Sequence, residues 1–418
     1  MSEQNWAGTY TYRAPIVQAG TVEEVQRLVR AGGRVRALGT RHSFNDLPDT
    51  DGTLVSVTGI DPGFVLDEAD RTVEVGAGTR YGILARWLHE RGWALHNLGS
   101  LPHISVGGAT ATGTHGSGVG NGVLTSAIRA IEYVDATGEL ARVALGDADF
   151  EGMAVGLGAY GVVVRLTLAI EPSYRVRQDV YTGLRWAEAL DDLPAVTGAG
   201  YSVSLFTRWT GDEVGQLWIK TRLAADDDPV VDELLGARRG EGSANSLGED
   251  FGDNLTEQGG VPGPWLERLP HFRLDSTPSN GDEIQTEYFV APADAVPALQ
   301  AVRSLADRIA PHLLVSELRT AASDRLWLSG AYERGLFAIH FTWRNEPDAV
   351  RAVVPEIEQA LADFAPRPHW GKLHGMRASD IERSVPRLAD ARGLFERLDP
   401  EGVFTNDSLE RVGVRATR

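Results

Sequence analysis

The sequence predicts an α+β protein of two domains. Its 418 residues, of which 42% are hydrophobic, exceed the length at which a single hydrophobic core stops growing. Up to about Pro172, short strands alternate with amphipathic helices, whereas from Tyr174 longer strands with alternating apolar residues predominate. This change of pattern indicates that a second structural unit begins near residue 173.

Helix and strand signals in the first half are local and regular. Thr21 and Glu24 have the spacing of a capping box, which predicts a helix through Arg30, and residues 34–38 then have the pattern of a strand. The same reasoning predicts a strand from Thr72, a helix over 80–91 that ends at Gly92, and strands over 128–135, 140–144 and 162–170.

The second half combines long strands with two helices. Strands are expected over 201–208 and 216–222, and helices near 293–309 and 348–364. The segment 240–264 is rich in glycine, acidic and amide residues, which predicts a surface excursion.

Two glycine-rich segments, residues 38–46 and 98–118, are the most informative feature of the chain. Backbone can approach a pyrophosphate closely only where side chains are absent, and its free N–H groups then bind the anion. Hydroxyl side chains lie among these glycines and add short donors, namely Ser100, Ser105, Thr112, Thr114 and Ser117. The two segments are therefore expected to form two walls of one cofactor site, although glycine runs are often plain loops and a lone histidine such as His42 is often structural.

Residues 156–161 match the dinucleotide pattern G-x-G-x-x-G, but their context does not fit. That fingerprint requires a helix whose N-terminus meets the pyrophosphate, and here the apolar run 162–170 predicts a strand. A turn between two elements is the expected structure.

Composition excludes several classes of protein. The formal charge of −18 disfavours nucleic acid and anionic lipid as partners. The absence of cysteine excludes disulfides, thiolate zinc sites, iron–sulfur clusters and cysteine nucleophiles. No leader or membrane-spanning pattern is evident, so we expect a cytoplasmic protein with no membrane partner.

Polar residues at alternate positions mark two apolar strands of the second half. Glu317 and Arg319 are two residues apart and so project from one face, as do His340 and Thr342. They indicate a buried polar patch, with an exposed cross-strand pair as the alternative. A third polar segment spans residues 368–374 and includes His369 and Lys372.

Four motifs together resemble the FAD-linked sugar and polyol oxidases, which have the vanillyl-alcohol oxidase type of fold. They lie at residues 5–8, 39–45, 98–108 and 111–118, and the resemblance extends to the tail at 399–406. It implies an FAD-binding domain over 1–172, completed by 374–418, and an inserted α+β substrate cap domain over 173–373.

The resemblance implies FAD bonded covalently through His42, with no metal ion. Doubly tethered relatives also use a cysteine, which this chain lacks. The residues implied to bind the cofactor are Ala37, Leu38, Gly39, Thr40, Arg41, His42, Ser43, Ser100, Ser105, Gly108, Thr112, Gly113, Thr114, His115, Val163 and His369. His340 and His369 are implied to hold the flavin ring or tune its charge.

The substrate implied by the resemblance is an alditol of the xylitol and sorbitol class, oxidised at its terminal primary hydroxyl to the aldose. The residues implied to bind it are Ser100, Glu317, Arg319, Thr342 and Lys372. Arg319 and Lys372 would stabilise the developing alkoxide while a hydride passes to flavin N5. The proton acceptor stays open between Lys372, a solvent path and Glu317.

By resemblance, the small residue before the substrate serine bears on oxygen access to the flavin; here it is Gly99, which would leave room, with a plain turn glycine as the alternative. By resemblance, this favours an oxidase that produces hydrogen peroxide over a dehydrogenase. O2 and the polyol are then the small-molecule partners of an expected monomer.

Three alternatives stay open. An aldonolactone oxidase of the gulonolactone type, or a dehydrogenase of the same fold, shares several of these motifs. A metal-dependent hydrolase is disfavoured because His369 and His374 lack the i,i+4 spacing of a helical zinc pair and have no acidic third ligand nearby. A flavin-free carbohydrate-binding protein is the non-enzyme alternative.

Overall fold

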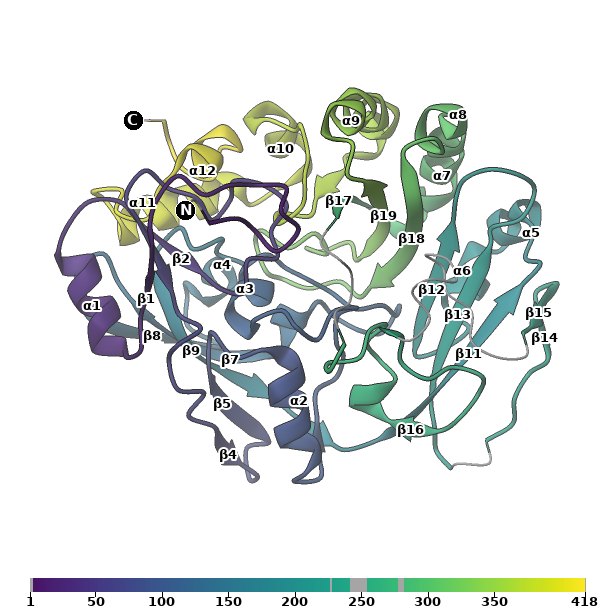
Figure 1. The fold of residues 1–418 in the computed structure, drawn as a ribbon, viewed down its shortest axis with the longest axis horizontal. Coiled ribbons are helices and arrows are strands. Elements are labelled where there is room, and N and C mark those ends of the chain that lie inside the picture. The colour runs from purple at the N-terminus through teal and green to yellow at the C-terminus, as the bar shows by residue number, and fades with distance from the viewer. Residues whose placement is uncertain (1–2, 226–227, 241–253, 277–281, 418) are drawn as a thin grey trace.

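The first half of the chain forms two small sheets with helices packed around them. A computed structural model describes residues 3–225, 228–240, 254–276 and 282–417. In Figure 1 this half lies on the left, with the long strands of the second half on the right. The parallel strands β1 (Ile16–Gln18), β3 (Thr53–Ser56) and β2 (Val35–Leu38) form one sheet, in that order. An antiparallel sheet has the order β4 (Val65–Asp67), β5 (Thr72–Gly76), β9 (Val162–Ala169), β7 (Ile128–Val134) and β8 (Leu140–Ala144).

Helix α1 (Val22–Arg30) shows how the local sequence produces these elements. The hydroxyl of Thr21 accepts a hydrogen bond from the backbone N–H of Glu24, which confirms the predicted cap. Val25 and Val29 are buried on one face, where they pack with Val35 and Val55 of the parallel sheet. The other helices of this half are α2 (Tyr81–His89), α3 (Val106–Ala111), α4 (Phe150–Met153) and the 3₁₀ helix Leu124–Ala127.

A strand follows the glycine pattern at 156–161, which confirms that this pattern is not a dinucleotide fingerprint. The segment is a turn that leads into β9. The buried guanidinium of Arg36 donates to the carbonyl oxygens of Leu157 (2.7 Å) and Gly158 (2.7 Å) and holds the turn in place.

One large sheet contains the long strands of the second half. Its order is β14 (Glu233–Leu234), β15 (Ala237–Arg239), β11 (Arg175–Thr182), β13 (Gln216–Arg222), β12 (Ser202–Thr207), β18 (Leu313–Ala321), β19 (Leu336–Arg344), β17 (Glu283–Val290) and β20 (Arg367–Pro368), and β16 (Gly263–Pro264) also pairs with β11. A short ribbon of β6 (Trp93–Ala94) and β10 (Glu171–Pro172) lies just before this sheet begins.

Strand β19 is buried on both faces, and the two faces differ in chemistry. Ile339, Phe341 and Trp343 belong to the hydrophobic core. His340 and Thr342 alternate with them and line a cavity on the other side. In Figure 1 the helices of this half lie on the outer side of the sheet. These are α5 (Trp186–Asp191), α6 (Leu193–Thr197), α7 (Ala295–Arg303), α8 (Ala306–Ile309) and α9 (Pro347–Leu361).

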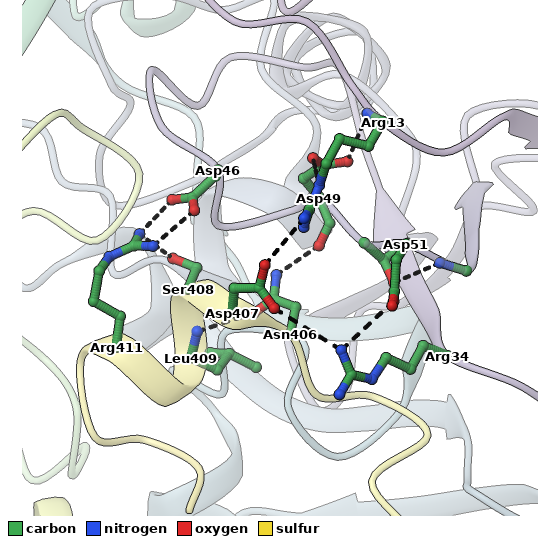
Figure 2. A network of polar contacts seen from close by, with 12 residues as sticks. Arg13, Arg34, Asp46, Asp49, Asp51, Asn406, Asp407, Ser408, Leu409 and Arg411 are labelled. Atoms are coloured by element: carbon green, nitrogen blue, oxygen red, sulfur yellow. Dashed lines mark hydrogen bonds and ion pairs between the residues drawn. The ribbon is translucent and has the colours of Figure 1, made fainter. Parts of the chain in front are cut away.

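The C-terminal tail packs against the N-terminal part of the chain (Figure 1). It contains α10 (Ala378–Ser384), α11 (Leu388–Leu398) and α12 (Asp407–Arg411). Figure 2 shows the contacts: Arg411 pairs with Asp46, and Arg13 bridges Asp49 (2.9 Å) and Asp407 (3.0 Å). Asn406 caps α12 and donates to the carbonyl oxygen of Asp49 at 2.6 Å. The tail is thus tied to the loop that follows β2.

Two segments differ from the sequence prediction. The helix expected over 293–309 is broken into α7 and α8. Residues 241–253 of the expected surface excursion lie outside the described residues. In the part that follows them, Glu257 and Val261 are exposed as expected, whereas Leu255 departs from the prediction. Leu255 is buried among Val180, Phe206 and Trp218, because its apolar side chain completes a small core beneath the large sheet.

Within the described ranges, we find no helix that combines the length and apolar character needed to cross a bilayer.

Candidate active site

A cavity separates the two glycine-rich segments from the large sheet. One wall comes from residues 37–43 and from residues between Gly99 and His115, and the opposite wall comes from β17, β18, β19 and the loop after β20. Except for Gly113, all the residues predicted to bind cofactor line this cavity, as do Gly99, Glu317, Arg319, His340, Thr342 and Lys372. Gly113 is a turn residue with φ of 66° and does not line it.

The two glycine segments touch each other directly. The backbone N–H of Ser105 donates to the hydroxyl of Thr40 at 2.9 Å, and the N–H of Thr40 donates back to the hydroxyl of Ser105 at 3.4 Å. A Cβ on Gly39 would lie 2.2 Å from the Ser105 hydroxyl oxygen, so only glycine permits this approach. The segments therefore form one continuous wall with exposed backbone.

His42 is held rigidly at the edge of this wall. Its ring stacks on Trp6 with centroids 5.0 Å apart, and its Nδ1 lies 3.1 Å from the Thr40 hydroxyl. Burial, reinforced by the charges of His103 and Arg80, lowers the pKa of His42 to about 4, so the imidazole is neutral at pH 7. Its Nε2 is buried without a hydrogen-bond partner among the described residues. A neutral ring with an unpartnered nitrogen is suited to act as a nucleophile.

Strand register produces the opposite wall. Pairing aligns Phe206 of β12, Glu317 of β18, His340 of β19 and Glu287 of β17 in one row across the sheet. Directly paired residues project from the same face, so this row places two carboxylates beside one imidazole. In the neighbouring row, Val315, Thr342 and Gln285 are paired in the same way.

Glu287 lies at the centre of a buried ion network. One carboxylate oxygen is 2.9 Å from Nη2 of Arg319, and the other is 3.0 Å from Nζ of Lys372. Nε2 of His115, from the second glycine segment, lies 3.3 Å away. Burial opposes ionisation of Glu287, but Lys372 and Arg319 outweigh it and hold the pKa of this carboxyl well below its usual range.

Glu317 is a second buried carboxylate of the same face. Its Oε1 is 2.7 Å from Nε2 of His271 and 3.6 Å from Nε of Arg319. Burial again opposes ionisation, but the charge of Arg319 and the hydrogen bond from His271 hold the pKa of Glu317 below its usual range. Arg319 also donates to the hydroxyl of Ser100 at 3.2 Å, which connects the sheet to the second glycine segment.

Two buried histidines face the cavity as neutral rings. Burial lowers the pKa of His369 to about 3, and its Nδ1 accepts from the backbone N–H of Gly371 at 3.1 Å. Its Nε2 lies 3.4 Å from the hydroxyl of Thr114. Burial, together with Lys372, keeps the pKa of His340 well below normal, and neither ring nitrogen of His340 has a hydrogen-bond partner in the described part of the chain.

Sequence reasoning missed Glu287, His271 and Lys220. A signal for Glu287 was present, because Glu283, Gln285 and Glu287 occupy alternate positions of β17, with Ile284 and Thr286 between them. All three line the cavity. His271 had no such signal, since it lies in a loop and reaches Glu317 only through the tertiary fold.

FAD fits this cavity. The wall formed by the glycine segments offers bare backbone and hydroxyls suited to a pyrophosphate, and the unpartnered nitrogen of His42 marks one edge. The opposite wall offers the charged and neutral donors that a polyhydroxyl substrate requires. No group of three or more metal-binding side chains was found among the described residues.

Comparison with known proteins agrees with this geometry. Residues 14–144 match the family "FAD binding domain", and residues 282–412 match the family "D-arabinono-1,4-lactone oxidase". Cholesterol oxidase from Brevibacterium sterolicum has the same fold, with a TM-score of 0.78 at 15% identity over 98% of this chain and 96% of that one. The fold and the family matches define an FAD-dependent oxidoreductase with the vanillyl-alcohol oxidase fold.

Two curated relatives extend over nearly the whole chain. Alditol oxidase from a Streptomyces species is 44% identical over 97% of this chain and 97% of its own length. L-gulono-1,4-lactone dehydrogenase from Mycobacterium tuberculosis is 29% identical over 95% of this chain and 94% of its own length. The chain belongs to the alditol oxidase family, which is related to the aldonolactone oxidases.

Removal of the charge at Glu287 tests the network. We expect Glu287→Gln to lower the free energy of unfolding by about 3 kcal/mol at pH 7, because it leaves two buried cations without their counter-ion. The folded-state pKa of Glu287 is depressed, so its stabilisation is present above the ordinary glutamate pKa of about 4.3 and is lost as pH falls. The difference from the unmodified chain in urea unfolding should therefore narrow in acid.

The matched control is Glu356→Gln, which removes an exposed carboxylate that pairs with Arg308 at 2.7 Å. It should leave the urea midpoint unchanged. Equal midpoints for Glu287→Gln and this control would contradict the network.

Proposed function

We propose that the chain oxidises the terminal primary hydroxyl of alditols such as xylitol and sorbitol to the aldose, with release of hydrogen peroxide. The observation that carries this proposal is the polar wall of the cavity, where Ser100, Glu317, Arg319, Thr342 and Lys372 offer donors and acceptors to several hydroxyls. The 44% identity to alditol oxidase supports the same substrate class. FAD, when bound, supplies the hydride acceptor and passes two electrons to O2.

Arg319 and Lys372 are the proposed catalytic cations. Both contact Glu287, so their positions are fixed before a substrate arrives. A hydroxyl between them would meet preorganised positive charge as its oxygen becomes an alkoxide.

Glu317 is proposed to bind a substrate hydroxyl as a hydrogen-bond acceptor. Because Arg319 and His271 stabilise its anionic form, its carboxylate is a weak base, which makes it the least suited of the three proton acceptors considered from the sequence. Lys372 could accept the proton only as a neutral amine, in which form it would not act as a cation, so the solvent path is the acceptor that remains.

His42 is the proposed covalent link to the flavin. Its neutral, unpartnered Nε2 and the stacking of its ring on Trp6 support attack on the 8α-methyl carbon. His42 would hold the flavin through a C–N bond formed in place of one C–H bond of that methyl group, with the proton passing to solvent and two electrons to O2. The same proposal includes the other cofactor contacts named from the sequence. It also includes an FAD domain over 1–172 and 374–418 and a cap domain over 173–373.

Gly99 is proposed to leave O2 access to the flavin. A Cβ at this position would be in van der Waals contact with Ile104 (3.6 Å), the carbonyl oxygen of His115 (3.8 Å) and Leu124 (3.9 Å), so a methyl group would fill the small space that glycine leaves. A monomeric state and a cytoplasmic location remain predictions.

Parallel peroxide assays test the substrate class. With xylitol, sorbitol and L-gulono-1,4-lactone, we expect alditol turnover to exceed lactone turnover by about tenfold or more, because the cavity pairs a chain of hydroxyls. The match of residues 282–412 to a lactone oxidase family makes the lactone the relevant competitor. Turnover of the lactone alone would assign the aldonolactone activity instead.

The state of the flavin tests His42. After acid precipitation, the unmodified chain should stay yellow, and His42→Ala should lose its colour to the supernatant because the linking nitrogen is gone. His312→Ala is the control, since His312 is partly exposed and contacts Glu346 instead of the cavity. Colour retained on precipitated His42→Ala would refute the linkage.

A further inference from the structure

The chain contains only two lysines, Lys220 and Lys372, among its 40 lysine and arginine residues. Both lie at or behind the polar wall of the cavity: Lys372 is partly buried and lines it, and Lys220 is buried and contacts His271, which lines it. Lysine differs from arginine in having a compact head that can lose its proton when buried. The placement of both lysines at the candidate active site indicates that Lys220, like Lys372, serves that site.

Lys220 reaches the cavity through His271. It lies on β13 and is 1% exposed, and its Nζ is 3.0 Å from Nδ1 of His271. It also donates to the carbonyl oxygen of Leu269. On the far side of the same ring, Nε2 of His271 is 2.7 Å from Oε1 of Glu317. The three side chains form a continuous hydrogen-bonded chain that ends at a proposed substrate residue.

The direction of these hydrogen bonds follows from the lysine. An ammonium group has donors only, so Nδ1 of His271 must accept and the ring proton must lie on Nε2. Nε2 then donates to Glu317. The ionised carboxylate of Glu317 can only accept and so requires the same tautomer, which the ammonium form of Lys220 stabilises.

His271 is itself fixed in position. The edges and faces of Phe206 and Trp218 surround the ring, with centroids 5.6 Å and 5.1 Å away. Its backbone N–H donates to the carbonyl oxygen of Ser100 at 3.1 Å. One residue therefore contacts two of the residues proposed to bind the substrate.

We infer that Lys220 and His271 are positioning residues that hold Glu317 in place as the acceptor for a substrate hydroxyl. His271 occupies Oε1 of Glu317, which leaves Oε2 for the substrate. This inference rests on the proposed function for its substrate, while the chain of hydrogen bonds itself is independent of it.

The charges around Lys220 are consistent with the Lys220–His271–Glu317 relay, the hydrogen-bonded chain of these three side chains. The charged groups that act on Lys220 are Glu317 and Arg319 of β18, and His271 faces it from the loop. Its strand neighbours are the uncharged Gln178 and Ser202. Burial lowers the pKa of Lys220 to about 7, and Glu317 opposes that change. The loss of the proton from the Lys220 ammonium group therefore falls near neutral pH, where a titration of the folded protein can detect it.

Two lysines make the relay measurable without any substrate. In FAD-loaded protein labelled with [13Cε]lysine, carbon NMR should give two side-chain signals, and Lys220→Met should remove one. In His271→Leu, the Lys220 ammonium loses an acceptor, so its proton affinity should fall about tenfold further. The Lys372 titration should stay unchanged. A Lys220 titration that is the same with and without His271 would overturn the relay.

Kinetics then test positioning. Lys220→Met and His271→Leu should each raise KM for xylitol by about tenfold and change kcat less than threefold, a loss comparable with removal of an outer hydrogen-bond partner. Because both act through one chain, the double variant should have the KM of a single variant. His271→Gln, which keeps a donor for Glu317, should recover most of the affinity even if Lys220→Met does not fold.

Arg177→Met is the matched control. Arg177 is a buried cation of the same sheet that pairs with Asp179 at 2.9 Å and does not line the cavity, so its replacement should not change KM. Two results would contradict the positioning role of Lys220 and His271. One is a KM in the double variant that equals the product of the two single effects, and the other is a KM increase in Arg177→Met as large as in Lys220→Met. If the unmodified chain does not oxidise alditols, the proposed function fails, and the lysine titration still decides the relay.

Discussion

The carboxylate of Glu287, held between Arg319 and Lys372, is the interaction on which the cavity depends. A buried charge is costly unless it is paired or well hydrogen-bonded, and here one anion satisfies two cations and also contacts His115. These partners come from β18, from the loop after β20 and from the second glycine segment. The network therefore connects the large sheet to the wall proposed to hold the flavin. It also fixes two positive charges at one point of the cavity before any substrate is bound.

The sheet achieves this because β17, β18 and β19 are buried on both faces with opposite chemistry. Phe341 and Trp343 pack into the hydrophobic core, and the alternate positions His340 and Thr342 face the cavity. Register then aligns Glu317, His340 and Glu287 across three strands. A slip of one residue in any of these strands would turn its polar side chains into the core, so the site and the core specify the same register.

Features that depend on the local spacing of residues could be predicted from the sequence. Alternation placed Glu317 and Arg319 on one face, and glycine density marked the two segments that meet at Thr40 and Ser105. Strand partners are set by long-range packing: β17 pairs with β19, although β18 lies between them in sequence. Glu287 could therefore not be assigned to the network in advance, and neither could His271.

The two glycine-rich segments, prominent in the sequence, account for only half of the site. They explain how backbone can approach a cofactor, whereas the proposed substrate class rests mainly on polar residues of the opposite wall. We expect Arg319 and Lys372 to bind the reacting hydroxyl of an alditol, and a crystal structure of the FAD-loaded chain with xylitol would show whether they do. A terminal hydroxyl should lie within hydrogen-bond distance of both Arg319 and Lys372, with the remaining hydroxyls near Ser100, Glu317 and Thr342. Xylitol bound elsewhere, or with no terminal hydroxyl at these two cations, would contradict this expectation.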